Sequence, residues 1–192
     1  MNYKASILAI TFSLIIFANL NAQDSLKAVH TNDSYKNSSL KLNFEIPTGW
    51  TCLTSKEEFE NINLNDERLD LGVYNSSAII ELKKDKEETI PSIRIFVKIL
   101  PEESKINFSK LSSIDLVESM FSMTNRKPII HSVSLKKYKV GYTISKSKSE
   151  KQIVGMILSA DFLYQVYITY DKNDPNCTEQ EFERIFKSFD ID

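Results

Sequence analysis

The sequence predicts an α+β fold, an α/β/α sandwich with a central antiparallel sheet and helices on both of its faces. Runs with the two-residue period of strands alternate with short polar turns along much of the chain. Two of these runs, residues 152–160 and 162–170, are apolar on both alternating faces, so both sides of the sheet must be covered. Two amphipathic stretches with helical spacing, one central and one C-terminal, can supply that cover.

Residues 1–22 have the pattern of a signal peptide. Lys4 precedes an apolar run over residues 5–18, and small or polar residues lead to Gln23. This run is shorter than the ~20 residues that a transmembrane helix needs. We therefore expect cleavage after Ala22 and export to the periplasm or the extracellular space. No cysteine lies next to the junction, so we expect no lipid anchor.

The rest of the chain has the size of one domain. Residues 23–39 are polar and show little apolar periodicity, which predicts a flexible lead-in. Residues 40–192 are expected to form a single domain. The formal net charge of the sequence is −2, which excludes a general nucleic-acid binder.

The first predicted strand covers residues 40–46, where apolar and polar residues alternate. Pro47 and Gly49 follow it directly. Proline fixes its own backbone angle and glycine accepts conformations that other residues avoid, so the chain must turn here. We expect this turn to return Trp50 to the core.

A short helix and a hairpin are predicted next. Ser55 and Glu58 have the spacing of a capping box, which predicts a helix that continues through Ile62. Residues 78–83 and 92–100 have strand patterns on either side of a charged connection. The two are therefore expected to pair as an antiparallel hairpin.

The central and C-terminal elements complete the prediction. A helix begins at Ser112 or Ser113 and carries a broad apolar stripe, whose methionines are explained by packing rather than by a soft-metal site. An antiparallel meander follows, with strands near residues 129–138, 140–147, 152–160 and 162–170. Thr178 and Glu181 form a second capping box before a closing amphipathic helix that extends to Phe189.

Two cysteines, Cys52 and Cys177, lie in the predicted domain. In an oxidising compartment they could form a disulfide that ties the start of the fold to its last helix. The alternative is that both are small buried apolar residues. The sequence leaves both open, because it does not give the distance that a disulfide requires.

Lysines crowd the first hairpin of the meander and are the strongest local charge feature. The candidate partner-binding residues are Lys136, Lys137, Lys139, Lys146 and Lys148, with Lys151 close by. A solvated hairpin explains them, and a contact with an acidic protein surface or with anionic lipid headgroups would also suit them. Serines lie between them more often than aromatic residues do, which disfavours a stacking platform for nucleic acid.

Motifs for catalysis and cofactor binding are missing from the sequence. Its four glycines build neither a phosphate loop nor a dinucleotide fingerprint, and its two histidines cannot make a histidine-rich zinc site. Residues 171–176 are rich in oxygen ligands but lack the glycine and glutamate of a calcium loop. We therefore expect no cofactor, no metal and no enzymatic activity.

His131 is the one histidine in a predicted strand, next to Ile129 and Ile130. A partly buried structural histidine is the simpler interpretation. The alternative is the general base of a divergent hydrolase, with a serine or Cys52 as its nucleophile.

Two short motifs resemble a known family. One is F-x-x-P-x-G-W at the end of the first strand and the other is the terminal run E-R-I-F-K-S-F. With the order and type of the elements over about residues 40–190, they resemble the PsbP-like fold family, which includes photosystem accessory subunits and DcrB-type envelope lipoproteins. The motif residues, all of which have packing explanations, are Phe44, Pro47, Gly49, Trp50, Ile185, Ser188 and Phe189.

The resemblance implies an α/β/α sandwich and a non-catalytic role in binding or stabilising a larger partner. The leading hypothesis is thus an exported accessory or binding protein that associates with a protein partner in the cell envelope. The alternative is a carrier that shelters a small apolar ligand between sheet and helix, using the aromatic residues of the last strands.

Overall fold

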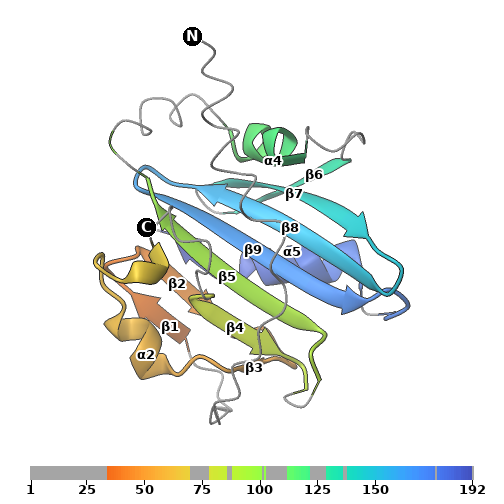
Figure 1. Cartoon of the computed structure of the whole chain (residues 1–192), viewed down its shortest axis with the longest axis horizontal. Helices are drawn as coiled ribbons and strands as arrows, with labels where there is room; N and C mark the ends of the chain where they lie inside the picture. Colours follow the sequence, from red (N-terminus) through yellow and green to blue (C-terminus); the bar gives the residue numbers. More distant parts are fainter. Residues whose placement is uncertain are drawn as a thin grey trace.

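Two antiparallel sheets form the framework of the molecule (Figure 1). The computed structural model describes residues 34–69, 78–85, 88–100, 102, 112–121, 129–135, 138–175 and 177–191. Within these residues the larger sheet has seven strands. In spatial order they are β3 (Thr51–Cys52), β4 (Ile80–Lys83), β5 (Ser92–Ile99), β9 (Phe162–Asp171), β8 (Glu150–Leu158), β7 (Lys139–Lys146) and β6 (Ile130–Ser134).

The smaller sheet joins the two ends of the described chain. Its middle strand is β2 (Leu42–Glu45), which pairs with β1 (Ser34–Asn37) on one side and with β10 (Phe189–Ile191) on the other. The described helices are α2 (Lys56–Asn61), the 3₁₀ turn η1 (Glu67–Leu69), α4 (Ser113–Phe121) and α5 (Glu179–Lys187).

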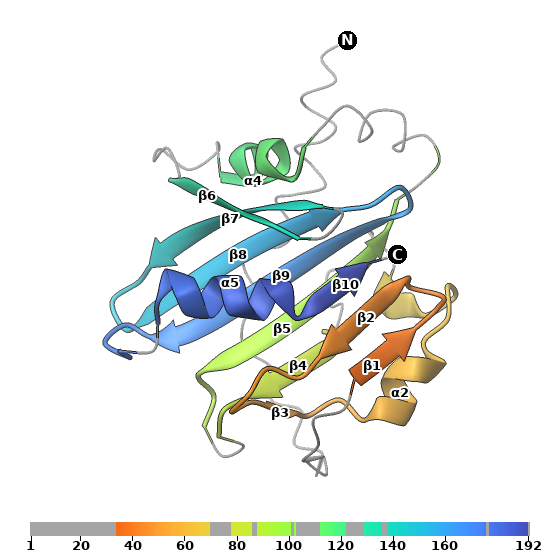
Figure 2. The same cartoon turned by 180° about the vertical axis from the view of Figure 1, so that it is seen from behind.

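The two faces of the large sheet are covered differently. The helix α4 packs against β6, β7 and β8 on one face (Figure 1). On the other face, α5 crosses the sheet and continues through β10 into the smaller sheet (Figure 2). Two glycines allow these helices to approach, because a Cβ at Gly141 would lie 2.8 Å from the Ile114 Cα and a Cβ at Gly155 would overlap the Phe186 ring.

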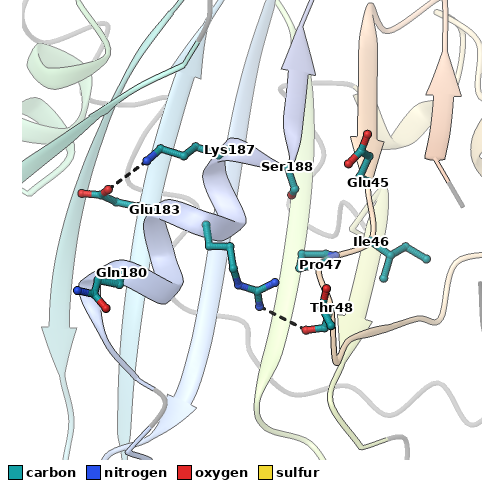
Figure 3. Close-up of a pocket in the computed structure, with 9 residues that line it drawn as sticks. Glu45, Ile46, Pro47, Thr48, Gln180, Glu183, Lys187 and Ser188 are labelled. Atoms are coloured by element: carbon teal, nitrogen blue, oxygen red, sulfur yellow. Dashed lines mark hydrogen bonds and ion pairs between the residues drawn. The ribbon is translucent and has the colours of Figure 1, made fainter. Parts of the chain in front are cut away.

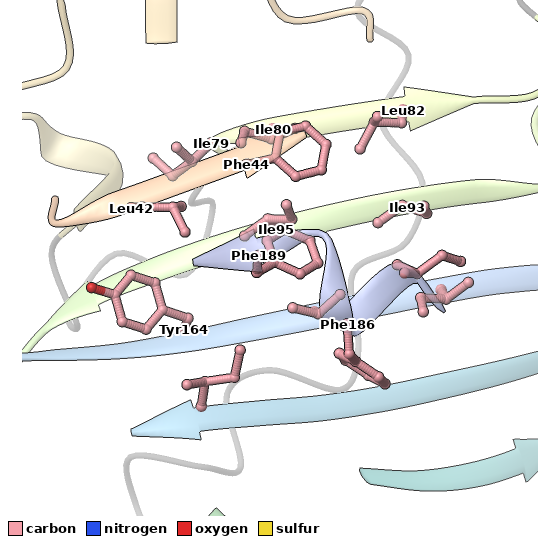
Figure 4. Close-up of a cluster of buried hydrophobic side chains, with 14 of the residues drawn as sticks. Leu42, Phe44, Ile79, Ile80, Leu82, Ile93, Ile95, Tyr164, Phe186 and Phe189 are labelled. Atoms are coloured by element: carbon pink, nitrogen blue, oxygen red, sulfur yellow. The ribbon is translucent and has the colours of Figure 1, made fainter. Parts of the chain in front are cut away.

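The core accordingly has two parts. The larger part fills the space between the large sheet, α5 and the smaller sheet (Figure 4). The smaller part lies on the α4 face and includes Leu116, Val117, Val154, Met156 and Leu163. The C-terminal strands are therefore apolar on both faces because both sides of the sheet are covered, as predicted, and each face contributes to a separate apolar cluster.

The α+β prediction and the antiparallel meander are confirmed, but the cover of one face is not helical alone. The smaller sheet lies beside α5 on that face (Figure 2). Its strands are three or four residues long, and strands this short give a weak periodic signal.

The predicted lead-in over residues 23–39 is wrong at its C-terminal end, because residues 34–37 form β1. Asn37 is 2% exposed, and its side-chain nitrogen donates to the Phe59 carbonyl at 2.6 Å and to the Ile62 carbonyl at 2.9 Å. A buried asparagine thus satisfies carbonyl groups at the end of α2. The polar composition of this strand hid its burial.

The closing helix ends earlier than predicted. It stops at Lys187, where the Ser188 backbone N–H donates to the Ile185 carbonyl at 3.1 Å. Phe189 begins β10 and stacks on its register partner Phe44, with ring centroids 5.1 Å apart. Strand pairing with β2 therefore overrides the helical spacing of Phe189.

Substitution of Gly141 by alanine should destabilise the fold. The added methyl group would meet the backbone of Ile114, which can move only if the whole of α4 shifts. We expect a loss of about 1–3 kcal/mol in the free energy of unfolding, measured by urea denaturation. Ser134→Ala on the exposed edge of β6 is the control and should change it little. Equal stability of Gly141→Ala and the wild type would contradict this packing.

Candidate functional site

The F-x-x-P-x-G-W motif forms the turn that leads from β2 into the large sheet. The Trp50 backbone N–H donates to the Pro47 carbonyl at 3.0 Å and closes a four-residue turn. Gly49, the third residue of this turn, has φ of +83°, and a Cβ there would meet nothing within 4 Å. Glycine is therefore needed for its backbone conformation rather than for space. As predicted, Trp50 is buried, at 6% exposure.

Glu181 on α5 connects this turn to the rest of the fold. Its Oε1 accepts from the Trp50 Nε1 at 3.4 Å and from the Tyr170 hydroxyl at 3.3 Å. Arg184 donates to both carboxylate oxygens, at 2.8 and 2.9 Å. The Lys84 ammonium lies 3.7 Å from Oε1 and above the rings of Trp50 and Tyr170. We call Trp50, Lys84, Tyr170, Glu181 and Arg184 the Glu181 cluster.

Opposing effects act on the charge of Glu181. Burial alone would raise the pKa of this carboxyl group, but the hydrogen bonds and charge of Arg184, the Trp50 N–H and the Lys84 charge outweigh it. The pKa of Glu181 is therefore lowered, and the carboxylate is ionised at neutral pH. Burial first, and then the negative charge of Glu181, raise the pKa of Tyr170, so its hydroxyl remains a donor.

A groove of about 630 Å³ adjoins the cluster and shares Arg184 with it, between the turn after β2 and the outer side of α5 (Figure 3). Arg184 lines the groove and donates to the Thr48 carbonyl at 3.4 Å. Its lining residues are Glu45, Ile46, Pro47, Thr48, Gln180, Glu183, Arg184, Lys187 and Ser188.

The charges in this groove compensate one another. Lys187 pairs with Glu183 at 3.4 Å, and Arg184 pairs with Glu181. The charged lining residues are two acidic (Glu45 and Glu183) and two basic (Arg184 and Lys187), so their formal charges cancel and do not favour a strongly charged small ligand. The mixed polar and apolar lining suits the surface of a protein, which presents donors, acceptors and apolar groups together.

The lysines do not form one patch. Lys139 begins β7 and Lys146 ends it, and both are exposed. At the rise of an antiparallel strand these two lie about 24 Å apart. Lys148 is exposed near Lys146, whereas residues 136 and 137 lie outside the described residues. Among the described residues, Lys139 therefore lies apart from Lys146 and Lys148, because an extended strand runs between them.

Lys151 has a different role from the exposed lysines. Its ammonium donates to the Cys177 carbonyl at 2.9 Å and lies 5.5 Å from the centre of the Phe182 ring. It thereby holds the segment before α5 against the start of β8.

Both cysteines are free thiols in the structure, so the disulfide left open by the sequence is not formed. The Cys52 thiol lies beside Tyr35 and Thr54, whereas Cys177 lies beside Lys151. These surroundings share no residue, so the two side chains occupy different parts of the core. Burial raises the pKa of Cys52 to about 11 and also raises that of Cys177.

His131 stacks on Tyr142, with ring centroids 5.2 Å apart, and its Nδ1 lies 3.4 Å from Glu179. Among the residues that the structure describes, no serine hydroxyl or cysteine thiol bonds to it. These contacts fit the structural interpretation.

No protein-family profile matches the chain, and no curated protein matches its sequence. Solved structures resemble it in fold. One is the solution structure of cyanobacterial PsbP (CyanoP) from Synechocystis sp. PCC 6803, with a TM-score of 0.51 and 8% sequence identity over 91% of this chain and 98% of that chain. The chain has a PsbP-like fold.

A crystal structure from Bacteroides thetaiotaomicron VPI-5482 has a TM-score of 0.49 and 8% identity over 84% of this chain. The match spans only 49% of that protein, and we infer no property of this chain from it. The family resemblance predicted from the sequence is thus confirmed for the fold alone. At 8% identity to CyanoP, no residue role transfers to this chain.

Replacement of Glu181 by glutamine should destabilise the fold by about 1–3 kcal/mol at pH 7, because charged hydrogen bonds to Arg184, Trp50 and Tyr170 weaken. The folded pKa of Glu181 lies below its ordinary value of 4.5. Its contribution is therefore present above about pH 4.5 and is lost as the pH falls further. The difference in the free energy of unfolding between the wild type and Glu181→Gln, measured by urea denaturation, should therefore shrink below about pH 4.5.

Glu183→Gln is the control for this prediction. The exposed pair of Glu183 with Lys187 should contribute at most about 1 kcal/mol. If both substitutions had the same small effect, Glu181 would not hold the turn to α5.

Both thiols should be unreactive in the folded protein. With a pKa of about 11, Cys52 is a thiolate in roughly one molecule in a thousand at pH 8. We expect slow reaction with a thiol reagent at pH 8 and rapid reaction of two thiols in urea. Absence of free thiols in urea without reductant would contradict the structure and indicate a disulfide.

Proposed function

We propose that the protein is an exported, non-catalytic accessory protein that binds a larger protein partner in the cell envelope. The observation that carries this proposal is the fold, which matches CyanoP over 98% of that chain. The PsbP-like family includes accessory subunits of a larger complex, as the sequence resemblance implied. Export is supported by the signal-peptide pattern of residues 1–22. Among the described residues, no helix is long and apolar enough to cross a membrane.

The groove beside α5 is the first candidate surface for the partner. Thr48 and Gln180 are exposed on its two walls, and neither belongs to the Glu181 cluster. The turn and the helix are held rigidly by that cluster, so a partner would meet a preorganised surface. The second candidate is the group of exposed lysines at Lys146 and Lys148.

The carrier hypothesis receives no support from the α5 face. The ring of Phe186 lies directly over Gly155, and Phe182, Ile185 and Phe186 on the inner side of α5 are 0% exposed. Side chains therefore fill this space, where the hypothesis placed an apolar ligand.

Crosslinking in cells tests the proposal. The tagged protein, expressed in its native host with its own leader, is crosslinked, purified from the envelope fraction and analysed by mass spectrometry. We expect one abundant partner protein. A double variant Thr48→Lys and Gln180→Lys should reduce its recovery at least tenfold, because two added charges and long side chains occupy the groove.

Two further variants locate the surface. Lys146→Glu with Lys148→Glu tests the exposed lysines, and loss of the partner in that variant alone would move the interface to them. Glu57→Lys with Glu60→Lys adds charge to the exposed side of α2 and serves as the control. Recovery of the protein alone in repeated experiments would refute the proposal.

A further inference from the structure

A second group of side chains lies on the α4 face, on strands that α4 leaves to one side. Phe96 and Lys98 belong to β5, and Gln165 and Tyr167 belong to β9. The register pairs Phe96 with Gln165, so their side chains leave the sheet on the same side. Phe96 also meets Tyr167 edge to face, with ring centroids 5.4 Å apart. The helix α4 packs mainly against β6, β7 and β8 (Figure 1).

Gln165 is the anomaly in this group. It is 1% exposed, and its Oε1 is buried without a hydrogen-bond donor among the described residues. The large majority of buried side-chain polar atoms in proteins have a hydrogen-bond partner. An unpaired amide oxygen in the middle of a sheet is therefore costly for the fold, and such a cost is typical of a position that serves a ligand.

Lys98 is the neighbour of Gln165 on the diagonal of the register. Its side chain is 5% exposed, and no hydrogen bond or ion pair joins its ammonium to another described residue. Burial lowers the pKa of Lys98. Diagonal residues on adjacent antiparallel strands lie ~7–8 Å apart, so the two polar groups are neighbours on this face of the sheet.

The remaining members of the group supply an apolar and aromatic wall. The Phe96 and Tyr167 rings stand beside Gln165, and Met156 is its register partner on β8. Burial raises the pKa of Tyr167 to about 12, so its hydroxyl stays protonated. The group thus combines a buried cation, a free acceptor and aromatic surface.

We propose that Phe96, Lys98, Gln165 and Tyr167 form a binding site for a small aromatic or apolar organic acid that also carries a hydrogen-bond donor. The acid group pairs with the Lys98 ammonium, the donor reaches the Gln165 Oε1, and the apolar body rests on Phe96 and Tyr167. This chemistry satisfies both unpaired polar groups at once, which a purely apolar ligand would not do. The site is independent of the proposed partner surface, since it uses the opposite face of the sheet from α5.

Two fluorescent probes test this site. Anilinonaphthalene sulfonate carries an anion, an N–H donor and aromatic rings, whereas N-phenylnaphthylamine has the same N–H and rings without the anion. We expect the folded protein to bind the sulfonate saturably at one site. Lys98→Met should weaken binding of anilinonaphthalene sulfonate at least tenfold and binding of N-phenylnaphthylamine less than threefold.

Variants of Gln165 complete the test. Gln165→Leu should weaken both probes, because it removes the acceptor for their N–H, and it should raise the midpoint of thermal unfolding by removing an unpaired polar group. Gln165→Glu should block the sulfonate by pairing with Lys98. Lys139→Met, an exposed lysine on β7, is the control and should leave both affinities unchanged.

Three results would overturn the proposal. The first is that the folded protein does not bind the sulfonate saturably. The second is that Lys98→Met binds the sulfonate as tightly as the wild type does. The third is that Lys139→Met weakens sulfonate binding as much as Lys98→Met does. Near-ultraviolet circular dichroism of each variant separates loss of the site from loss of folding, because a partly unfolded protein binds the sulfonate without specificity. Since partner recovery is measured separately, failure here leaves the crosslinking result standing.

Discussion

The contact between the turn after β2 and the last helix joins the two ends of the described chain. Trp50 and Glu181 are separated by 131 positions in the sequence, yet they share a hydrogen bond. The helix α5 has nine residues, fewer than the ~12–15 that an isolated helix needs to be even marginally stable in water. It therefore depends on its buried side and on the Glu181 cluster. Through β10, the same segment also pairs with β2 and closes the smaller sheet.

This arrangement gives the two faces of the large sheet different characters. On the α5 face, aromatic and aliphatic side chains pack together, and Phe186 lies over Gly155. On the α4 face, the helix packs on one end of the sheet, and the neighbouring strands carry Lys98 and Gln165 among apolar residues. Stability comes chiefly from the first face, since it buries most of the core. The second face contains the polar groups that packing alone does not explain.

The strands of the large sheet were predictable wherever eight or more residues alternate, as in β5 and β7 to β9. The strands β1, β3 and β10 were not predicted. Strand β1 is polar in composition, β3 has only two residues, and Phe189 of β10 also fits the helical spacing of the segment before it. The groove was likewise missed, since its walls come from segments far apart in the sequence. The lysines were noticed for their spacing in the sequence, but an extended strand separates Lys139 from Lys146.

Local chemistry by itself determined the turns, the caps and the alternation of this protein. Pro47 and Gly49 require a turn, while Ser55 and Thr178 accept from backbone N–H groups three residues on, as their capping boxes predict. These features depend on neighbours within a few residues, which the sequence displays directly. Tertiary structure alone decided which carboxylate accepts the hydrogen bond of the Trp50 indole N–H. It also decided that the two cysteines form no disulfide and which polar side chains become buried. Those outcomes follow from the register and packing of distant strands, and no local pattern encodes them.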